Sequence, residues 1–323
     1  MKESCKIVFL ERDTLGSDVD LSGFSELGEV VTYAKSDPEK NAARAAEADV
    51  LIVNKIPVNE TLLAGANHLK LVCLTATGTN NVDFSYMAGR GIPVANVKGY
   101  STDSVVQHTF ALLFYVYEKL AFYDRFVKSG EYTRSDIFSR FDAPFRELSG
   151  KTWGVIGLGS IGRKVADVAR AFGCSICYYS TTGANLQPEY RPVSLETLLE
   201  ESDIVSIHAP LTPATEGLIG RAELARMKSS AVLLNLGRGP IVVEEALTEA
   251  LEKGSIAGAG LDVLSVEPMR ADNPLRRVQD STRLIVTPHI AWATVEARQR
   301  CADEVCENIR AFLRGEARNL VSG

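Results

Sequence analysis

The sequence predicts an α/β protein built from two doubly wound parallel sheets. Short apolar segments rich in Val, Ile and Leu alternate with helix patterns through the first hundred residues, and this alternation is typical of parallel sheets covered by helices. The same alternation starts again at Lys151 and continues to residue 286. A chain of 323 residues is long for one hydrophobic core, so two domains of ordinary size are expected.

The first part of the chain contains five candidate strands separated by helix patterns. The strands are expected at residues 5–10, 30–33, 50–53, 71–75 and 93–95. One helix is predicted over 38–48, with Asp37 as its N-cap and Pro38 at its first position. Another is predicted over 83–90 and should end at Gly91, because glycine adopts the left-handed conformation that closes a helix.

Polar turns follow the third and fourth of these strands. Lys55 comes shortly after the strand at 50–53, and Thr77 and Gly78 follow the strand at 71–75. In doubly wound sheets the ligand binds beyond the carboxyl ends of the strands. We therefore expect Lys55, Thr77 and Gly78 to line a binding crevice.

A long helix without glycine or proline is predicted from Ser104 to about Lys128, which is long enough to cross between domains. Residues 129–150 are polar and irregular. After Lys151, further strands are expected at 175–179, 204–207, 231–236, 257–263 and 284–286, with helices at 194–200, 222–227 and 244–253. A last amphipathic helix over 295–313 should return to the first domain, because the second sheet is complete before it.

Three glycines in the pattern G-x-G-x-x-G follow a short apolar strand and open a helix pattern. They are Gly157, Gly159 and Gly162. In a dinucleotide site the first glycine permits a tight turn, the second leaves room for a pyrophosphate, and the third lets helix and strand pack closely. Amides at the start of the helix, including those of Ser160 and Ile161, then face the phosphates. The stretch predicts a Rossmann nucleotide-binding domain.

The position that selects between NAD and NADP holds no carboxylate. An Asp or Glu about 20 residues past the glycines binds the ribose 2′-hydroxyl of NAD, and this position falls at Ser180, followed by Thr181 and Thr182. These hydroxyls would not repel a 2′-phosphate, and Arg163 or Arg191 could contribute a charge. The choice between NAD and NADP stays open.

Three residues at successive strand ends carry the chemistry of a dehydrogenase. Arg238, Glu267 and His289 each follow an apolar strand of the second sheet, so they are expected to converge beside the cofactor. Histidine, with an ordinary pKa near ~6.5, suits proton exchange with a carbonyl oxygen. Glu267 is the expected partner of that imidazole, and Arg238 offers a two-pronged donor for a substrate carboxylate. His68 and His108 are interpreted as packing or surface residues, and His208 as a residue at a strand end.

Composition limits the function further. A net charge of −6 gives no reason to expect a nucleic-acid partner, and the longest apolar run, 110–117, is far shorter than the ~18 residues that span a membrane. No signal-peptide core follows Met1, so a cytoplasmic protein is expected. Cys174 and Cys177 form a C-x-x-C on an apparent strand, where residues three apart point to opposite faces, so no metal site is expected.

These motifs together resemble the D-isomer-specific 2-hydroxyacid dehydrogenase family over essentially the whole chain. The segments that carry the resemblance are 157–162, 208–212, 235–239, 260–263 with Glu267-Pro268, and 287–289. Within the family, segments 76–83, 99–102 and 107–109 are most similar to glycerate dehydrogenases and hydroxypyruvate reductases. The family usually carries Asp where this chain has Ser180.

The resemblance implies a flavodoxin-like substrate-binding domain, residues 1–100 plus 293–323, around a Rossmann domain at 101–292. It implies His289 as acid/base, Glu267 as its partner and Arg238 as the carboxylate anchor. Family members are commonly homodimers, with the long helix after Tyr100 in the interface.

The resemblance also implies contacts to the cofactor. Asp262 would hold the nicotinamide carboxamide side, and the amides near Thr77 would share the substrate carboxylate. Thr77 and Arg238 are expected to contact the cofactor as well as the substrate. The other expected cofactor contacts are Ala209, Pro210, Leu236 and Gly237.

The sequence therefore leads to the hypothesis of an NAD(P)-dependent reductase that converts a small 2-keto acid, with hydroxypyruvate or glyoxylate favoured, into its (R)-2-hydroxy acid. Two alternatives stay open. One is a dinucleotide-sensing, corepressor-like binding protein, which the resemblance allows. The other is a dehydrogenase of another small anion, such as formate or phosphite, on the same scaffold.

Overall fold

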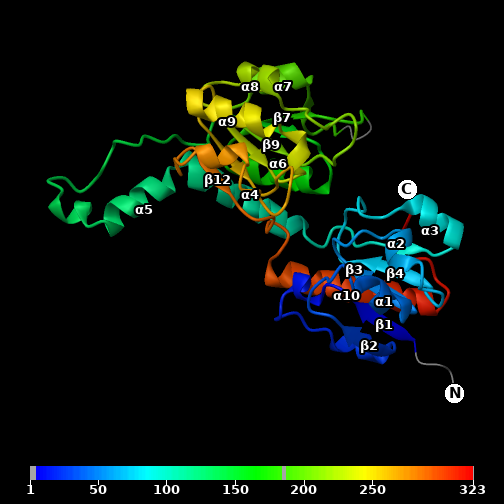
Figure 1. Ribbon diagram of the computed structural model, residues 1–323. Coiled ribbons are helices and arrows are strands. Elements are labelled where there is room, and N and C mark those ends of the chain that lie inside the picture. The colour runs from blue at the N-terminus through cyan, green and yellow to red at the C-terminus, as the bar shows by residue number, and fades with distance from the viewer. Residues whose placement is uncertain (1–4, 184–186, 323) are drawn as a thin grey trace. The chain divides into compact units, whose positions relative to one another are not determined.

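The structure, a computed structural model, describes residues 5–183 and 187–322. It divides into two compact units (Figure 1). Unit 1 comprises Met1–Ser101 and Ala293–Gly323, and unit 2 comprises Thr102–Trp292. Each unit contains a parallel sheet with helices packed on it, so the predicted fold class is confirmed.

Within the described residues, unit 1 is built on a six-stranded sheet in the order β13-β5-β4-β3-β1-β2. Its strands are β1 (Lys6–Phe9), β2 (Glu29–Thr32), β3 (Val50–Val53), β4 (Leu71–Leu74), β5 (Val94–Ala95) and β13 (Leu320–Val321). The first five are parallel and follow the order 2-1-3-4-5 of flavodoxin-like sheets. The short antiparallel edge strand β13 was not predicted.

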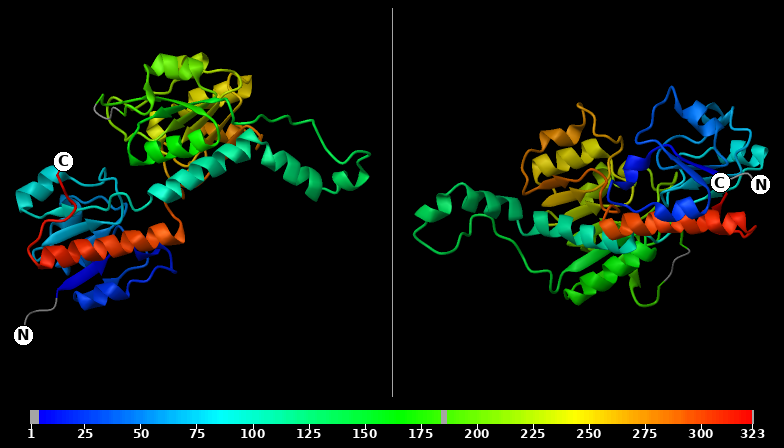
Figure 2. Two further views of the ribbon diagram at one scale, coloured as in Figure 1. Left: turned by 180° about the vertical axis from the view of Figure 1, so that it is seen from behind. Right: turned by 90° about the horizontal axis from the view of Figure 1, so that it is seen from below.

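The helices of unit 1 are α1 (Asn41–Ala46), α2 (Glu60–Leu63), α3 (Phe84–Arg90) and α10 (Val295–Leu313), with 3-10 turns at Arg12–Leu15 and Ser22–Glu26. Side chains of α1, α2 and α3 pack on one face of the sheet, and α10 packs against β4 (Figure 2). The predicted bounds of α10 are confirmed, and α3 ends at Gly91 as expected. Asp83 accepts a hydrogen bond from Tyr86 N, and Gly91 adopts the left-handed conformation.

The first predicted helix starts later than expected. Its N-cap is Lys40 rather than Asp37, and residues 38–40 form a turn. The Asp37 carboxylate accepts from Glu39 N, and the Asn41 side chain accepts from Asp37 N. These local bonds hold the segment as a turn before α1 begins, in competition with a regular helical turn.

Unit 2 contains, within the described residues, a seven-stranded parallel sheet in the order β12-β11-β10-β9-β6-β7-β8. The strands are β6 (Thr152–Ile156), β7 (Ser175–Tyr179), β8 (Arg191–Pro192), β9 (Ile204–Ile207), β10 (Val232–Asn235), β11 (Gly258–Leu261) and β12 (Leu284–Val286). Counted from β6, the order is 3-2-1-4-5-6-7, which extends the Rossmann order by one strand. The predicted Rossmann arrangement is therefore confirmed.

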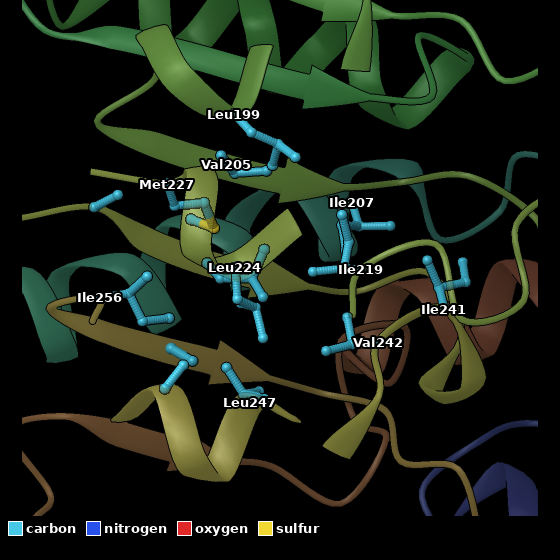
Figure 3. Packing of buried hydrophobic residues seen from close by; sticks show 14 of the residues in the cluster. Leu199, Val205, Ile207, Ile219, Leu224, Met227, Ile241, Val242, Leu247 and Ile256 are labelled. Carbon is cyan, nitrogen blue, oxygen red and sulfur yellow. The ribbon is translucent and has the colours of Figure 1, made fainter. Parts of the chain in front are cut away.

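Helices cover both faces of this sheet. The helices of unit 2 are α4 (Thr102–Tyr117), α5 (Leu120–Lys128), α6 (Ser160–Ala171), α7 (Leu195–Glu201), α8 (Arg221–Arg226) and α9 (Glu244–Lys253), with 3-10 turns at Glu131–Arg134, Gly239–Ile241 and Pro274–Arg277. Residues of α7, α8 and α9 form one core cluster with the sheet (Figure 3), and residues of α4 and α6 form another. Cys177 belongs to the first cluster and Cys174 to the second, as expected from the alternation of a strand.

The predicted long helix is broken. Lys119 adopts a left-handed conformation with φ 57°, so α4 ends at Tyr117 and α5 begins at Leu120. The Lys119 ammonium donates a hydrogen bond to the carbonyl of Thr282 at 2.9 Å, which supports this unusual backbone. The segment 118–150, here named the arm, extends away from the sheet of unit 2 (Figures 1 and 2).

Glycines let α4 approach β11 closely. A Cβ at Gly258 would collide with the Val116 side chain, and a Cβ at Gly260 would lie 3.0 Å from the Leu112 Cβ. Val116 and Leu112 are four residues apart on α4, and the two glycines are two apart on β11. Helix and strand therefore run along each other in register, because four helical residues span ~6 Å and two strand residues ~6.6 Å.

Among the residues that the structure describes, no helix combines the length and apolar character needed to cross a membrane.

We predict that Gly258→Ala destabilises the protein, because the new methyl would meet Val116 and lie 2.9 Å from the Arg283 carbonyl oxygen. Overpacking of this kind costs about 1–3 kcal/mol, which corresponds to a melting temperature lower by about 2–10 °C. Gly89→Ala is the control, since a Cβ at Gly89 would meet no atom within 4 Å. Equal melting temperatures for the two variants would contradict the close approach of α4 to β11.

Candidate functional site

The glycine turn of unit 2 joins β6 to α6 and has the conformation of a phosphate-binding turn. Gly157 has φ +90°, and a Cβ there would lie 2.7 Å from the amide nitrogen of Ala209. A Cβ at Gly162 would collide with the Gly157 carbonyl. Around Gly159, by contrast, an added Cβ would meet no protein atom within 4 Å. The first and third glycines are required by packing, whereas the second borders open space that a pyrophosphate can occupy.

The N-terminus of α6 supplies main-chain donors beside this turn. The first hydrogen bond of the helix runs from Arg163 N to the Gly159 carbonyl, so the amides of Ser160, Ile161 and Gly162 precede the helical ladder. Gly159, the N-cap, contributes no side chain to cap them. Such amides and the helix dipole favour an anion, so the turn fits the phosphates of a dinucleotide.

Neighbouring strand ends pack against the glycine turn. Ala209 follows β9 and faces Gly157 directly, with Pro210 next in the chain. Leu236 and Gly237 follow β10, and a Cβ at Gly237 would lie 2.8 Å from the Ala209 carbonyl oxygen. The structure thus brings the four expected cofactor contacts at these two strand ends to the same edge of the sheet as the glycine turn.

Ser180 directly follows β7 at the same edge. The carbonyl of Tyr179 accepts a hydrogen bond from Gly157 N at 3.0 Å, which places Ser180 beside the glycine turn. Of the two arginines suggested by the sequence, Arg191 forms an ion pair with Glu201, and Arg163 lies in the first turn of α6. Residues 180–183 contain neither a carboxylate nor a cation, so this end of the site excludes neither NAD nor NADP on charge.

His289 and Glu267 form a hydrogen-bonded pair in unit 2. The His289 Nδ1 donates to a Glu267 Oε2 at 2.7 Å, and the other carboxylate oxygen accepts from Leu264 N at 2.9 Å. The two side chains are 23% and 33% exposed, so the pair is held in place yet accessible to a small molecule. Since Nδ1 is engaged, Nε2 is the ring atom available for proton exchange with a substrate.

The backbone at His289 is also held in place. Its φ of 54° is unusual for a residue other than glycine, and its amide donates to the Asp262 carbonyl at 2.9 Å. The buried Asp262 carboxylate accepts from Ile290 N, Ala291 N and the Thr287 hydroxyl, at 2.9, 2.9 and 2.6 Å. The expected cofactor residue Asp262 therefore also anchors the segment on both sides of His289.

His108 is half-buried, as a packing residue would be, but it also has polar partners that the sequence did not indicate. Its Nε2 lies 3.0 Å from the Thr287 hydroxyl and 3.5 Å from Asp262 Oδ1. Burial lowers the pKa of His108, and the Asp262 carboxylate opposes that shift. Sequence reasoning missed this contact because His108 and Thr287 are 179 residues apart and only the packing of α4 on β11 brings them together.

Arg238 lies in a tightly packed turn after β10. The side-chain amide of Asn235 makes two bonds in this turn. Its Nδ2 donates to the Arg238 carbonyl at 3.0 Å, and its Oδ1 accepts from Gly237 N at 3.1 Å. A Cβ at Gly239 would collide with the main chain at Leu264. The Arg238 turn therefore touches the segment whose amide binds Glu267, and the structure places all three expected catalytic residues in one part of unit 2.

His208 has no such partner. Both ring nitrogens are buried and make no hydrogen bond to the described residues, and burial lowers the pKa of His208 to about 3. The ring is therefore neutral at physiological pH. The backbone at His208 still serves the site, because its amide donates to the Ile156 carbonyl at 2.8 Å and ties β9 to β6 just before the glycine turn.

In unit 1, the expected substrate residues lie at the carboxyl ends of β3 and β4. The Thr77 hydroxyl donates to the Val97 carbonyl at 2.6 Å, and the Asn96 amide donates to the Thr77 carbonyl at 2.7 Å. These bonds orient the turn at Thr77 and Gly78. They also occupy the hydrogen of the Thr77 hydroxyl, which is donated to Val97. Lys55 lies in the turn after β3.

A carboxylate that the sequence did not indicate holds the turn of Lys55. Glu11 Oε2 accepts hydrogen bonds from the amides of Asn54, Lys55 and Ile56, at 2.9, 2.9 and 3.1 Å. Glu11 lies just after β1, whereas Asn54 directly follows β3. Because the two residues are 43 positions apart in the chain, only the pairing of β1 with β3 brings them together.

Comparison with known proteins identifies the family. A family model described as D-isomer specific 2-hydroxyacid dehydrogenase, NAD binding domain, matches residues 110–291. The chain belongs to this family. It is 37% identical to a glycerate dehydrogenase of Methylorubrum extorquens, over 98% of each chain, and 36% identical to a hydroxypyruvate reductase of Blautia hydrogenotrophica, over 98% of this chain and 99% of that one.

A solved structure extends the likeness to the fold. An acyclic imino acid reductase in complex with NADPH and D-Arg matches with a TM-score of 0.85 and 29% identity, over 98% of this chain and 99% of that one. The family assignment makes the protein an oxidoreductase with an NAD-binding domain that interconverts 2-keto and 2-hydroxy acids. The glycine turn fits that cofactor, because the space beside Gly159 is open to a pyrophosphate, whereas Gly157 and Gly162 are closely packed.

We predict that Gly159→Ala weakens the binding of NADH and NADPH about 10-fold, or ~1.4 kcal/mol, because the methyl enters the space beside the turn. Its melting temperature should equal that of the wild type, since no protein atom lies within 4 Å of the added Cβ. Gly157→Ala should instead lower the melting temperature, because of its positive φ and its contact with Ala209. Fluorescence titration and thermal unfolding measure both effects, and wild-type affinity in Gly159→Ala would contradict the assignment of the turn.

Proposed function

We propose that the protein is an NAD(P)-dependent reductase of a small 2-keto acid, with hydroxypyruvate or glyoxylate as favoured substrates and the (R)-2-hydroxy acid as product. The observation that carries this proposal is the 2.7 Å pair of His289 and Glu267 in the unit that also holds the glycine turn and Arg238. The names of the two relatives, glycerate dehydrogenase and hydroxypyruvate reductase, support a three-carbon hydroxylated substrate.

His289 exchanges the proton of the reaction in this proposal. The bound nicotinamide supplies the hydride when a keto acid is reduced. The His289 Nε2 gives a proton to the carbonyl oxygen and takes it back in the opposite direction. Glu267 holds the ring by its Nδ1, which keeps Nε2 directed to the substrate.

The substrate carboxylate is bound by main-chain and charged donors. Arg238 donates one bond, from Nη1, to the Gly237 carbonyl at 2.8 Å, and this contact orients the planar guanidinium for a two-pronged carboxylate interaction. We further propose that Lys55, Thr77 and Gly78 of unit 1 bind substrate. Because the Thr77 hydroxyl is committed to Val97, the amides of this turn are the donors to expect.

Unit 2 binds the dinucleotide in this proposal, through the amides of the α6 N-terminus, the turns at Ala209 and Leu236, and Asp262 at the nicotinamide side. The uncharged segment 180–183 is compatible with NADH and NADPH alike. The imino acid reductase in complex with NADPH supports this, because a protein of similar fold binds the phosphorylated cofactor.

The decisive experiment is an initial-rate panel monitored at the reduced-nicotinamide absorbance. Hydroxypyruvate, glyoxylate, pyruvate and larger 2-keto acids are each tested with NADH and with NADPH, and formate and phosphite are tested with NAD. Turnover of a small keto acid is expected. No turnover of any keto acid, with dinucleotide binding intact, would contradict the reductase and favour a sensing protein. Turnover of formate or phosphite alone would favour a dehydrogenase of those anions.

His289→Ala is expected to lower kcat by ~10²- to 10⁴-fold while dinucleotide binding survives, because the proton donor is lost. Arg238→Ala should lower kcat/KM for the keto acid by about 10- to 100-fold, in line with the loss of charge-assisted hydrogen bonds. His68→Ala, on the surface of unit 1, is the control and should retain wild-type rates. Unchanged turnover in His289→Ala would remove this histidine from the mechanism.

We also propose that the protein forms a homodimer through the arm. The tip of the arm exposes apolar side chains that a monomer would leave in water: Phe138 is 89% and Phe141 76% exposed. The arm has internal order, since the Tyr123 hydroxyl donates to the Ala143 carbonyl at 2.8 Å and Arg140 stacks over Phe126 at 4.2 Å. An ordered segment with an uncovered apolar tip is typical of an interface, and a second copy is the occupant that the family implies.

We expect the double variant Phe138→Asp with Phe141→Asp to be monomeric at concentrations where the wild type is dimeric, as measured by light scattering after size exclusion. Two carboxylates in an apolar contact carry a desolvation penalty that the interface cannot offset. Leu313→Asp, an exposed apolar position in unit 1, is the matched control and should remain dimeric. A monomeric wild type, or a dimeric double variant, would contradict the arm as the interface.

The six cysteines are all free thiols, which agrees with a reducing compartment. We propose that the protein acts in the cytoplasm.

A further inference from the structure

His108 lies on the face of α4 that follows β11. Val116 and Leu112 pack over Gly258 and Gly260. His108 continues the four-residue spacing of Val116 and Leu112 along α4, and Asp262 continues the two-residue spacing of Gly258 and Gly260 just past β11. The register of helix and strand therefore brings His108 to the strand end, where its Nε2 lies 3.5 Å from Asp262 Oδ1.

The hydrogen bonds around His108 have a definite direction. The Thr287 hydroxyl lies 2.6 Å from Asp262 Oδ1, and a carboxylate can only accept, so the hydroxyl donates its single hydrogen there. The same hydroxyl oxygen must then accept a hydrogen bond from His108, whose Nε2–H donates to it at 3.0 Å. The chain of donors runs from His108 through Thr287 to Asp262.

This chain ends at the groups that fix His289. Asp262 accepts from the amides of Ile290 and Ala291, which follow His289, and from the hydroxyl of Thr287, which precedes it. The positive φ of His289 is a conformation that a free loop would leave. The orientation of the Asp262 carboxylate, set in part by Thr287 and His108, thus determines where the His289 ring lies.

We propose that His108 is a positioning residue for the reaction: its Nε2–H orients the Thr287 hydroxyl and the Asp262 carboxylate, and thereby holds His289 in its reactive position. This inference rests on the proposed function, because it assigns His289 as the proton donor. His108 itself acts only through Thr287 and Asp262.

The state of the ring supports the assignment. Burial lowers the pKa of His108 although Asp262 opposes the shift, which favours the neutral imidazole with a single ring proton. The geometry requires that proton on Nε2. The nitrogen chemical shifts of the four histidines, measured on the wild-type chain labelled with ¹⁵N-histidine, report the tautomer without any substitution. A neutral His108 with its proton on Nδ1 would overturn the proposal.

The kinetic test compares His108→Leu, which removes the donor, with His108→Gln, whose amide nitrogen can occupy the place of Nε2. His108→Leu is expected to lower kcat about 10- to 100-fold, as for a small misplacement of a catalytic group, with the keto-acid KM changed less than about 3-fold. His108→Gln should regain most of the lost rate. A Gln variant as slow as the Leu variant, at equal melting temperature, would overturn the role of the donor.

Thr287 supplies the second arm of the test. Thr287→Val should reduce kcat as His108→Leu does, and Thr287→Ser should retain activity because it keeps the hydroxyl. If the two residues act through one chain, the double variant His108→Leu with Thr287→Val should be no more than about 2-fold slower than either single variant. Effects that multiply would show independent roles and would overturn the proposed chain.

The outcomes separate this inference from the proposed function. A wild-type chain without keto-acid turnover contradicts the proposed function, whatever the variants do. An active wild type whose His108→Leu and Thr287→Val variants keep full kcat contradicts the positioning role alone.

Discussion

The buried carboxylate of Asp262 is the constraint on which the candidate site depends. A charged group can be 2% exposed only if its hydrogen-bonding capacity is met, and here the donors are two amides and a hydroxyl from the segment 287–291. The hydrogen bonds that stabilise the buried Asp262 carboxylate are therefore the same ones that fix the conformation of the loop at His289. These bonds compensate for the unfavourable backbone at His289, and Ala291 adds a buried contact with the core of unit 2.

The position of Asp262 depends in turn on the contact between β11 and α4. Alternate glycines on β11 remove the side chains that would hold the helix away, and the helix then brings His108 to the strand end. On the other side of the site, the absence of a Cβ at Gly239 lets the Arg238 turn approach the main chain at Leu264, whose amide binds Glu267. Small residues thus set the spacing of the charged groups.

The sequence predicted what depends on periodicity and topology. Buried strands and capped helices such as α3 were found with small errors at their ends, and residues after successive parallel strands were expected at one edge of the sheet. The break at Lys119 could not be predicted, because neither glycine nor proline marks it and its support comes from the distant carbonyl of Thr282. The polar contacts of His108 could not be predicted for a similar reason, since they form only when α4 is placed in register with β11.

The carboxylate of Glu11 has a consequence for how unit 1 can recognise an anion. Each main-chain amide has one hydrogen to donate, and those of residues 54–56 all point to Glu11 Oε2. The protein has filled this cluster of donors with an internal anion, so a substrate carboxylate would have to displace Glu11 to use them.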